Sequence, residues 1–267
     1  MSSTRSFGIS LALLVLFAAQ LAAQPPHASP PGNCSLATLK GSYSFFEAAT
    51  LIGDPAMRMV TSGLIRFDGH GNSSGESITN VEGSGVAGVD SFTGTYAVNS
   101  DCTYSGDLTG GGVTFHFVGT IAGDGMLRET HYVITDPGWF APGTVKKIRP
   151  AACSLATLNG SYALFGEGTV TAYNPSQPIT HVGIVTYDGA GNFTGQDTIM
   201  LNGALIPDTF TGTYTVTEGC MIAVDIASAA VGVVHEKGWI VGHGKSTEVH
   251  LIVTDPGFVF SEMTKMQ

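Results

Sequence analysis

Charged residues are scarce in this chain of 267 residues. Only 12% of the residues are Asp, Glu, Lys or Arg, about half of the roughly 25% of an average soluble domain. Lys and Arg together number 11 against 21 acidic residues, so the formal net charge is −10. Because phosphate contacts need clustered Lys and Arg, the composition predicts no nucleic-acid partner.

Three other patterns are missing. The hydrophobic content of 43% is too high for a disordered chain. The chain lacks the helical repeat of Ala, Glu, Lys and Leu that is typical of a coiled coil. The chain has no Gly-x-Ser-x-Gly nucleophile elbow, phosphate loop or dinucleotide fingerprint, and we therefore expect no cofactor. What remains is a globular chain rich in Gly and Thr.

The N-terminus has the pattern of a secretory signal peptide. Arg5 gives a positive start, an apolar run covers residues 7–17, and small residues precede a predicted cleavage site after Ala23. The run is shorter than the roughly 20 residues that cross a bilayer, which disfavours a membrane anchor. We predict a signal peptide over 1–23, a Pro-rich lead-in over 24–33, a secreted or periplasmic protein, and no membrane span after cleavage.

Most of the chain is a tandem repeat. Cys34-Ser-Leu-Ala-Thr-Leu-Lys-Gly-Ser-Tyr43 returns as Cys153-Ser-Leu-Ala-Thr-Leu-Asn-Gly-Ser-Tyr162, with nine of ten positions identical. Asp-Gly-x-Gly-Asn, Phe-Thr-Gly-Thr-Tyr and Thr-Asp-Pro-Gly also occur twice, in the same order. A period near 119 residues is too long for a solenoid and long enough for a separate core. We predict two domains, 34–150 and 151–267.

The four cysteines fall two to a copy. Exported chains commonly form disulfides, and four cysteines allow three pairings. The repeat favours Cys34–Cys102 and Cys153–Cys220, because pairing between the copies would require two interlocked domains. Each bridge would contribute about 4 kcal/mol in the chain-entropy model.

Each copy alternates short segments rich in Val, Ile, Thr, Tyr and Phe with Gly, Asp and Asn, which is typical of strands and hairpin turns. In the second copy the predicted strands cover 161–169, 181–187, 193–201, 209–216, 221–226, 232–241, 247–254 and 258–263. A short helical turn is expected over 35–39 and 154–158. The pattern predicts an all-β fold of two tandem antiparallel eight-stranded barrels. A pair of β-sandwiches is the alternative.

The Asp residues of the Asp-Gly-x-Gly-Asn segments could alternatively bind calcium. The spacing of an EF-hand is absent, so hairpin turns are the preferred interpretation.

Together these motifs resemble a family. The Cys-Ser-Leu-Ala-Thr-Leu-x-Gly-Ser-Tyr start, the Asp-Gly-x-Gly-Asn hairpin and the Phe-Thr-Gly-Thr-Tyr-x-Val strand with its downstream Cys are similar to secreted bacterial proteins of the allene oxide cyclase-like barrel group, which shares its barrel with dirigent proteins. The resemblance covers both copies and implies a barrel. If the protein is an enzyme, it implies an isomerase or cyclase, although no cyclase catalytic residue falls on a matching motif.

Identical polar residues at matching positions are candidates for chemistry. If a two-residue turn joins the strands concerned, one face of each copy holds a polar group of two His and one Glu. The members are His116, Glu129 and His131 in the first copy and His235, Glu248 and His250, beside Lys237, in the second. Such a set suits a transition metal or proton transfer.

A plainer interpretation is favoured for these faces. In the second copy the alternating positions carry Val249, Leu251 and Val253, which look like core and place Glu248 and His250 on the solvent side. We therefore predict no metal, with the six His and Glu residues as weak candidates only.

Two further groups could line an interior. Tyr43, Tyr96, Tyr162 and Tyr214 recur between the copies and are candidate pocket residues. Glu47 and Glu167 lie in the first strand of each copy at positions shifted by one residue, so one of them should point inward as an acid or base. With His116 and His235 they are the weak catalytic candidates.

An eight-stranded barrel can be filled by side chains or hold one small ligand. Our leading hypothesis is a secreted barrel protein that binds a small apolar molecule without converting it. The alternatives are a cofactor-free cyclase or isomerase and an extracellular protein- or glycan-binding module, in which two copies supply avidity.

Overall fold

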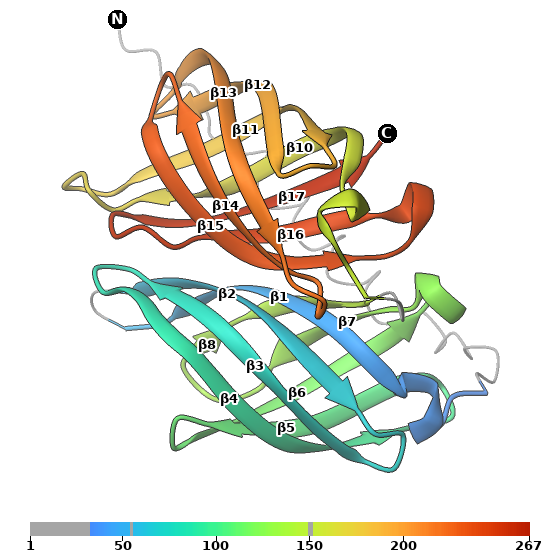
Figure 1. Ribbon diagram of the computed structural model, residues 1–267. Helices are drawn as coiled ribbons and strands as arrows, with labels where there is room; N and C mark the ends of the chain where they lie inside the picture. Colours follow the sequence, from blue (N-terminus) through green and yellow to red (C-terminus); the bar gives the residue numbers. More distant parts are fainter. Residues whose placement is uncertain (1–32, 54–55, 149–151) are drawn as a thin grey trace, which may run out of the picture. The chain divides into compact units, whose positions relative to one another are not determined.

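The computed structural model describes residues 33–53, 56–148 and 152–267, and it contains two closed antiparallel barrels (Figure 1). Barrel 1 closes through eight strands, in the order β2-β3-β4-β5-β6-β7-β9-β1, with β1 pairing back to β2 and the short β8 attached to β1. Its elements are η1 (Leu36–Leu39), β1 (Gly41–Leu51), β2 (Met57–Phe67), β3 (Asn72–Val81), β4 (Gly85–Val98), β5 (Thr103–Gly110), β6 (Val113–Ala122), η2 (Gly125–Leu127), β7 (Glu129–Ile134), β8 (Trp139–Phe140) and β9 (Pro142–Lys147).

Barrel 2 closes through β10 to β17 in chain order. Its elements are η3 (Leu155–Thr157), β10 (Asn159–Val170), β11 (Gln177–Asp188), β12 (Asn192–Leu201), β13 (Ala204–Val216), β14 (Met221–Ser228), β15 (Gly232–Val241), η4 (Gly244–Ser246), β16 (Glu248–Val253) and β17 (Phe258–Met266). The predicted all-β fold of two eight-stranded barrels is confirmed. The predicted signal peptide and most of the lead-in lie outside the described residues.

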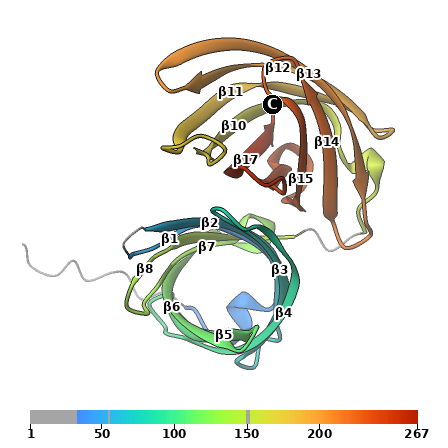
Figure 2. The ribbon, with the colours of Figure 1, turned by 90° about the vertical axis from the view of Figure 1, so that its left-hand side faces the viewer.

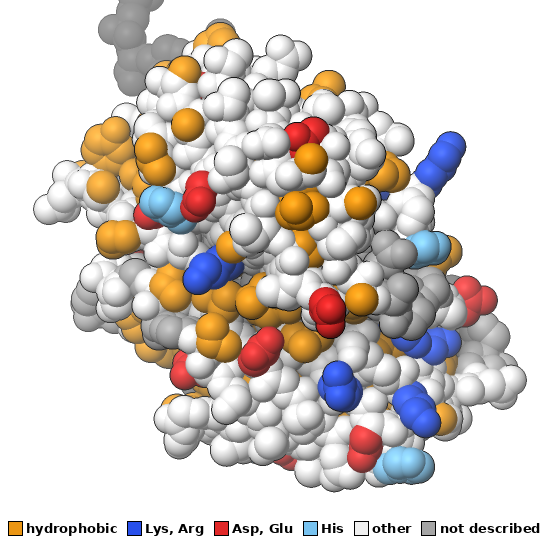
Figure 3. All heavy atoms as spheres, in the orientation of Figure 1, with side chains coloured by type: hydrophobic (Ala, Val, Ile, Leu, Met, Phe, Trp, Pro, Cys, Tyr) orange, Lys and Arg blue, Asp and Glu red, His pale blue; other side chains and the backbone are white. Residues whose placement is uncertain are grey.

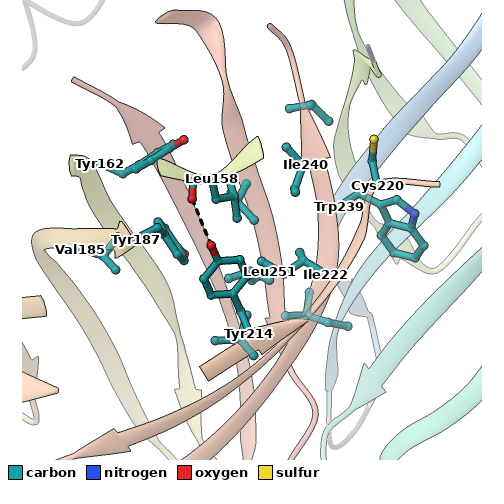
Figure 4. Close-up of a cluster of buried hydrophobic side chains, with 14 of the residues drawn as sticks. Leu158, Tyr162, Val185, Tyr187, Tyr214, Cys220, Ile222, Trp239, Ile240 and Leu251 are labelled. Atoms are coloured by element: carbon teal, nitrogen blue, oxygen red, sulfur yellow. Dashed lines mark hydrogen bonds between the residues drawn. The ribbon is translucent and has the colours of Figure 1, made fainter. Parts of the chain in front are cut away.

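Strand alternation fills the interior of each barrel. In β10, Tyr162 and Leu164 are buried and point inward, whereas Ala163 and Phe165, which alternate with them, are exposed. Tyr187 of β11 packs edge-on against Tyr162 and Tyr214, with ring centroids 5.3 and 5.2 Å apart. Figure 4 draws part of this inward layer, including Tyr162, Tyr187 and Tyr214, within a larger cluster of buried apolar side chains.

The Asp-Gly-x-Gly-Asn segments are tight hairpin turns. Asp68 accepts hydrogen bonds from the backbone N–H of His70 and Asn72 at 2.6 and 3.0 Å, and Asp188 accepts the same two bonds from Ala190 and Asn192. Gly69 and Gly71 have φ of +82° and +103°, which a residue with a side chain rarely adopts. The repeated Gly thus serves the turn itself.

One end of each barrel is covered by a short 3₁₀ helix, η1 in barrel 1 and η3 in barrel 2. These helices lie within the helical turns predicted over 35–39 and 154–158. In barrel 2 the hydroxyl of Tyr214 donates to the carbonyls of Leu155 and Leu158, both at 3.0 Å, and the second bond is dashed in Figure 4. Tyr96 makes the equivalent bond to Leu36 in barrel 1, and Figure 2 looks into this barrel with η1 in blue across the ring. We call this end of each barrel the closed end.

Both disulfides join the start of a copy to the turn after its fourth barrel strand, at the closed end. The bridges are Cys34–Cys102 and Cys153–Cys220, which are the pairings within each copy that the repeat predicts. The structure has no free cysteine among the residues it describes.

The hairpin that carries the repeated His and Glu residues is longer than predicted. A six-residue connection over 123–128, containing η2, replaces the expected two-residue turn between β6 and β7. Thr120 pairs with His131 and Val118 with Val133, whereas a two-residue turn would have placed Glu129 opposite Thr120. The shift is two residues, so the side chains keep the predicted face because strand side chains alternate with period two. The same correction applies to β15 and β16, where His250 pairs with Trp239.

On the face shown in Figure 3, charged side chains are few and separated by polar and apolar ones, as the low content of charge requires. Among the described residues, no helix is long and apolar enough to cross a membrane.

Candidate functional site

Barrel 2 contains a cavity between its middle and the end opposite η3, which we call the open end. The cavity measures about 70 Å³, counted as the space that the centre of a water-sized sphere can reach. Most of its wall is aliphatic or aromatic, contributed by Leu164, Ile179, Val185, Tyr187, Phe193, Ile199, Phe210, Val224, Ile226, Val231, Val234, Leu251, Val253, Phe258 and Phe260. The polar lining residues are His181, Asp197, Asp208, Ser228, Glu236 and Glu262.

A chain of three polar side chains crosses the middle of this wall. The Nδ1 atom of His181 lies 2.6 Å from Oδ2 of Asp197, and its Nε2 atom lies 3.5 Å from Oε2 of Glu262. The side chains are 12%, 3% and 8% exposed. We call Asp197, His181, Glu262 and the nearby Glu236 the acidic cluster.

Strand register brings the cluster together around Gly166. This glycine of β10 pairs with His181 of β11 on one side and with Glu262 of β17 on the other. A Cβ atom at Gly166 would collide with the Nε2 atom of His181 and with the ring of Phe260. The missing side chain therefore lets the His181 ring lie across β10 and reach Glu262.

Glu236 joins the cluster from β15. Its neighbours across the sheet, Val224 and Val253, also line the cavity, so its side chain points inward, and it is 3% exposed. Burial, followed by repulsion from Asp255, raises the pKa of Glu236 to about 8. Burial, together with the nearby Glu236 and Asp197, also raises the pKa of Glu262 well above its usual value. Both carboxyl groups therefore favour the protonated form in the empty cavity.

Several polar atoms of the cluster have no hydrogen-bond partner among the described residues. These are Oδ1 of Asp197, Nε2 of His181 and Oε2 of Glu236. Asp208 differs, because its oxygens accept bonds from the Ser228 hydroxyl and the Ala230 N–H and so hold the β14–β15 turn. Buried polar atoms without partners are uncommon in native proteins, and here they border a cavity.

Among the described residues of barrel 1, no equivalent cluster lies in the interior. Its cavity is about 20 Å³ and is lined mainly by aromatic and aliphatic side chains. Glu47 points inward from β1 and accepts a hydrogen bond of 3.0 Å from the hydroxyl of Tyr132, and burial raises its pKa to about 7. Glu167, the shifted counterpart in β10, is exposed. Of the two Glu candidates, Glu47 is thus the one inside a barrel.

The four candidate pocket tyrosines lie at the closed ends instead of beside the cavities. Tyr43 and Tyr162 are fully buried, and Tyr96 and Tyr214 are nearly so. The last two hold the 3₁₀ helices, and none of the four lines either barrel cavity. Their position is that of packing residues.

His116 and His235 occupy matching places on the outer faces. Nδ1 of His116 lies 2.8 Å from Oδ1 of Asp136, and Nδ1 of His235 lies 2.9 Å from Oδ1 of Asp255. These carboxylates raise the pKa of both imidazoles. Asp136 and Asp255 belong to the repeated Thr-Asp-Pro-Gly motif, so the repeated His and the repeated motif form one His–Asp pair at the open end of each barrel. We call the pairs His116–Asp136 and His235–Asp255 the surface clasps.

The remaining metal candidates are also on outer faces. Nε2 of His131 lies 3.5 Å from Oε1 of Glu129, and Nε2 of His250 lies 3.3 Å from Oε2 of Glu248. The first pair is partly exposed, whereas Glu248 and His250 are 6% and 4% exposed and so are not in solvent as predicted. Within the part of the chain that the structure describes, no three His, Cys, Asp or Glu residues are grouped to hold a metal ion.

The repeat gives no indication of the acidic cluster, because its residues are not shared by the two copies. His181, Asp197, Glu236 and Glu262 align with Thr61, Ser77, Phe117 and Gly143 of the first copy. The signal lay in positions where the copies differ. A charged residue such as Glu236 that follows the apolar Val234 at period two would have been a sign of an interior acid.

Comparison with known proteins gives little further guidance. No family model matches the chain, and no curated protein matches it. Among solved structures, one match is the crystal structure of a Nitrosomonas europaea protein provisionally described as AttH. It is 8% identical, has a TM-score of 0.22, and covers 84% of this chain and 92% of that chain. This likeness is too distant to bear on the chemistry, and the resemblance to the allene oxide cyclase-like group stays a prediction.

Proposed function

We propose that barrel 2 binds a small, mostly apolar molecule that carries one polar group, and that barrel 1 does not. The observation that carries this proposal is the cavity of barrel 2, whose apolar wall contains a buried cluster with unpartnered polar atoms. Binding sites for small molecules commonly combine apolar walls with a few convergent polar groups. The size of the cavity limits the ligand to a few carbon atoms unless the open end widens.

Secretion belongs to the same proposal. The two disulfides are typical of proteins that fold in an oxidising compartment, and the predicted signal peptide over 1–23 would deliver the chain there. The ligand would then be met outside the cytoplasm.

The proposal can be tested with 1-butanol as a minimal apolar probe. NMR titration should shift methyl signals of the barrel 2 wall, such as those of Ile199 and Leu251, saturably, and leave those of the barrel 1 interior unchanged. In parallel, native mass spectrometry of exported protein should reveal a bound species that organic extraction removes.

A matched pair of variants controls the titration. Val234→Phe fills the cavity with the residue that barrel 1 has at the equivalent position, Phe115. Val233→Phe adds the same ring on the outer face, where Val233 is 66% exposed. Binding should be lost in the first variant and kept in the second. Shifts that persist in Val234→Phe, or that never saturate, would contradict a site inside barrel 2.

Cofactor-free isomerisation is a second candidate function, favoured by the Asp197–His181 pair beside Glu262. A carboxylate that orients an imidazole next to a second acid can move a proton on a bound substrate. Incubation of the extracted natural ligand in D₂O should then incorporate deuterium with the wild-type protein. His181→Gln should abolish the incorporation without abolishing binding, and equal incorporation in both proteins would reject this function.

A further inference from the structure

The acidic cluster also indicates the charge of the ligand. Given the binding site proposed above, we infer that the polar group of the barrel 2 ligand is a positively charged amine, held by Asp197, Glu236 and Glu262. The ligand class is therefore a small alkylammonium ion, with its hydrocarbon part against the apolar wall.

The first support is the balance of charged groups around the cavity. Four acidic residues line it, together with one histidine, and among the described lining residues there is no Lys or Arg. Asp208 is occupied by the turn that it holds. Asp197 and Glu262 then share the single imidazole of His181, and no cationic side chain of the lining is left for Glu236.

The second support is the type of the unpartnered atoms. Oδ1 of Asp197 and Oε2 of Glu236 are buried oxygens without a donor, and the side chains are 3% exposed in each case. Once ionised, these carboxyl groups can only accept hydrogen bonds, whereas an ammonium group has three donors and no acceptor. An amine therefore supplies what the site lacks, while a carboxylate ligand would add further acceptors and further negative charge.

Protons take the place of the cation when the cavity is empty. Buried carboxyl groups keep their protons because ionisation in an apolar surrounding is unfavourable, and this holds for Glu236 and Glu262 near neutral pH. An arriving ammonium ion would favour their ionised forms and release protons to the solvent. The titratable groups that face this exchange are His181, Asp197, Asp208 and Tyr187, with Asp255 acting on Glu236.

The apolar wall accounts for the rest of the ligand. Phe260 lies beside the His181 ring, with centroids 5.1 Å apart, and Val234 precedes Glu236 on the same inward face. The hydrocarbon part would bury surface against these side chains while the amine meets the carboxyl groups. Barrel 1 has Phe117 and Gly143 where barrel 2 has Glu236 and Glu262, so this selectivity is confined to barrel 2.

Three probes of one shape test the inference: butylammonium, 1-butanol and butanoate, each titrated at pH 7 by NMR. Butylammonium should bind at least about tenfold more tightly than 1-butanol, because hydrogen bonds to charged groups are the stronger kind. Butanoate should not bind measurably. Calorimetry in two buffers of different ionisation enthalpy should show proton release with butylammonium and none with 1-butanol.

Variants then locate the preference. Glu236→Gln combined with Glu262→Gln should bring the affinities for butylammonium and 1-butanol within about threefold of each other. Glu167→Gln, which removes an exposed carboxylate from the outer face of β10, should change neither. The proton release of the wild-type protein decides the matter if the double variant does not fold.

The possible outcomes separate the two proposals. If 1-butanol binds as tightly as butylammonium, or if no proton is released, the ammonium inference is overturned and the binding function stands. If neither probe binds, the binding function itself is wrong. Tighter binding of butanoate than of butylammonium would reverse the predicted charge of the ligand.

Discussion

The two barrels share a frame and differ in what fills it. At the closed ends, the 3₁₀ helix, the disulfide and the tyrosine that bonds to the helix are the same in both. In the middle, barrel 1 carries a Glu47–Tyr132 pair over a small apolar cavity, whereas barrel 2 carries the acidic cluster over a larger one. A duplicated frame has thus kept its fold while its two interiors have diverged.

The divergence is compensated inside each barrel. Barrel 1 places Tyr132 over Gly143, where a Cβ atom would collide with the tyrosine ring. Barrel 2 has Leu251 and Glu262 at these two positions, and it places His181 over Gly166, at the position of Glu47. In each case a large inward side chain lies beside a glycine on the next strand. The ring occupies the space that a side chain at the glycine would otherwise fill, so the total interior volume is kept while the strand that supplies it changes.

The largest expected effect tests whether the frames are equivalent. Replacing both cysteines of one bridge by Ser should lower the free energy of unfolding of that barrel by about 4 kcal/mol. The loss should be the same in both barrels, because the bridges span 68 and 67 residues. Chemical denaturation of Cys34→Ser/Cys102→Ser and Cys153→Ser/Cys220→Ser measures it. A clear difference between the two losses would show that the closed ends contribute unequally.

Raised pKa values predict the next effect. In the unfolded chain a Glu side chain has a pKa of 4.5. In the folded barrels burial raises the pKa to about 7 for Glu47 and to about 8 for Glu236, so both keep their protons at higher pH. Because the native state binds more protons than the unfolded state in this window, stability should fall as pH rises from 4.5 toward 8. The decline should be on the order of 3 kcal/mol in barrel 2 and should end at lower pH in barrel 1.

Urea unfolding at pH 5 and pH 8 measures this decline. Trp139 lies in barrel 1 and Trp239 in barrel 2, so Trp139→Phe leaves a reporter for barrel 2 alone. Glu236→Gln with Glu262→Gln should flatten the pH dependence of this reporter, while Glu167→Gln should leave it unchanged. An unaltered decline in the double variant would show that other groups take up the protons.

Much of the frame was predictable from the sequence because it repeats. The Cys34-to-Tyr43 segment and its copy predicted the disulfides, the helical turns and the presence of two barrels, and alternation predicted the strands. The β6–β7 register was not predictable, since nothing local marks residues 123–128 as a 3₁₀ turn. The acidic cluster was not predictable either. The pKa values of Glu236 and Glu262 are raised because both side chains are buried inside the barrel near acidic groups on other strands, and these neighbours are far apart in the sequence.

The compensating glycines predict a smaller effect. Gly166→Ala and Gly143→Ala should each destabilise their own barrel by about 1–3 kcal/mol, because the added methyl group displaces a packed ring. Only Gly166→Ala should also weaken ligand binding, since it moves His181. Gly219→Ala is the control, because its nearest neighbour would be the Thr217 hydroxyl at 3.8 Å. Tolerance of both alanines would show that the rings shift freely, against the proposed exchange of volume.

The smallest expected effect concerns the surface clasps. Asp136→Asn and Asp255→Asn should each lower the pKa of the paired imidazole, His116 or His235, toward its usual value, because the carboxylate raises it. Stability should hardly change, since the imidazoles of His116 and His235 are 61% and 51% exposed and ion pairs with solvent-exposed partners contribute little. NMR titration of the imidazole protons provides the measurement. If the two histidines responded differently, the outer faces would have diverged as well as the interiors.

The closed end has one more consequence, which concerns how such chains grow. The chain enters barrel 2 there, where the Cys153 N–H donates to the Glu218 carbonyl, and it leaves there, where the Gln267 N–H donates to the Ser161 carbonyl. The open end carries only internal loops. Further units could therefore be joined in series without a connection crossing any cavity mouth, and the mouth loops are free to lengthen or change. This arrangement makes the barrel a modular unit whose interior can change from copy to copy while its connections stay the same.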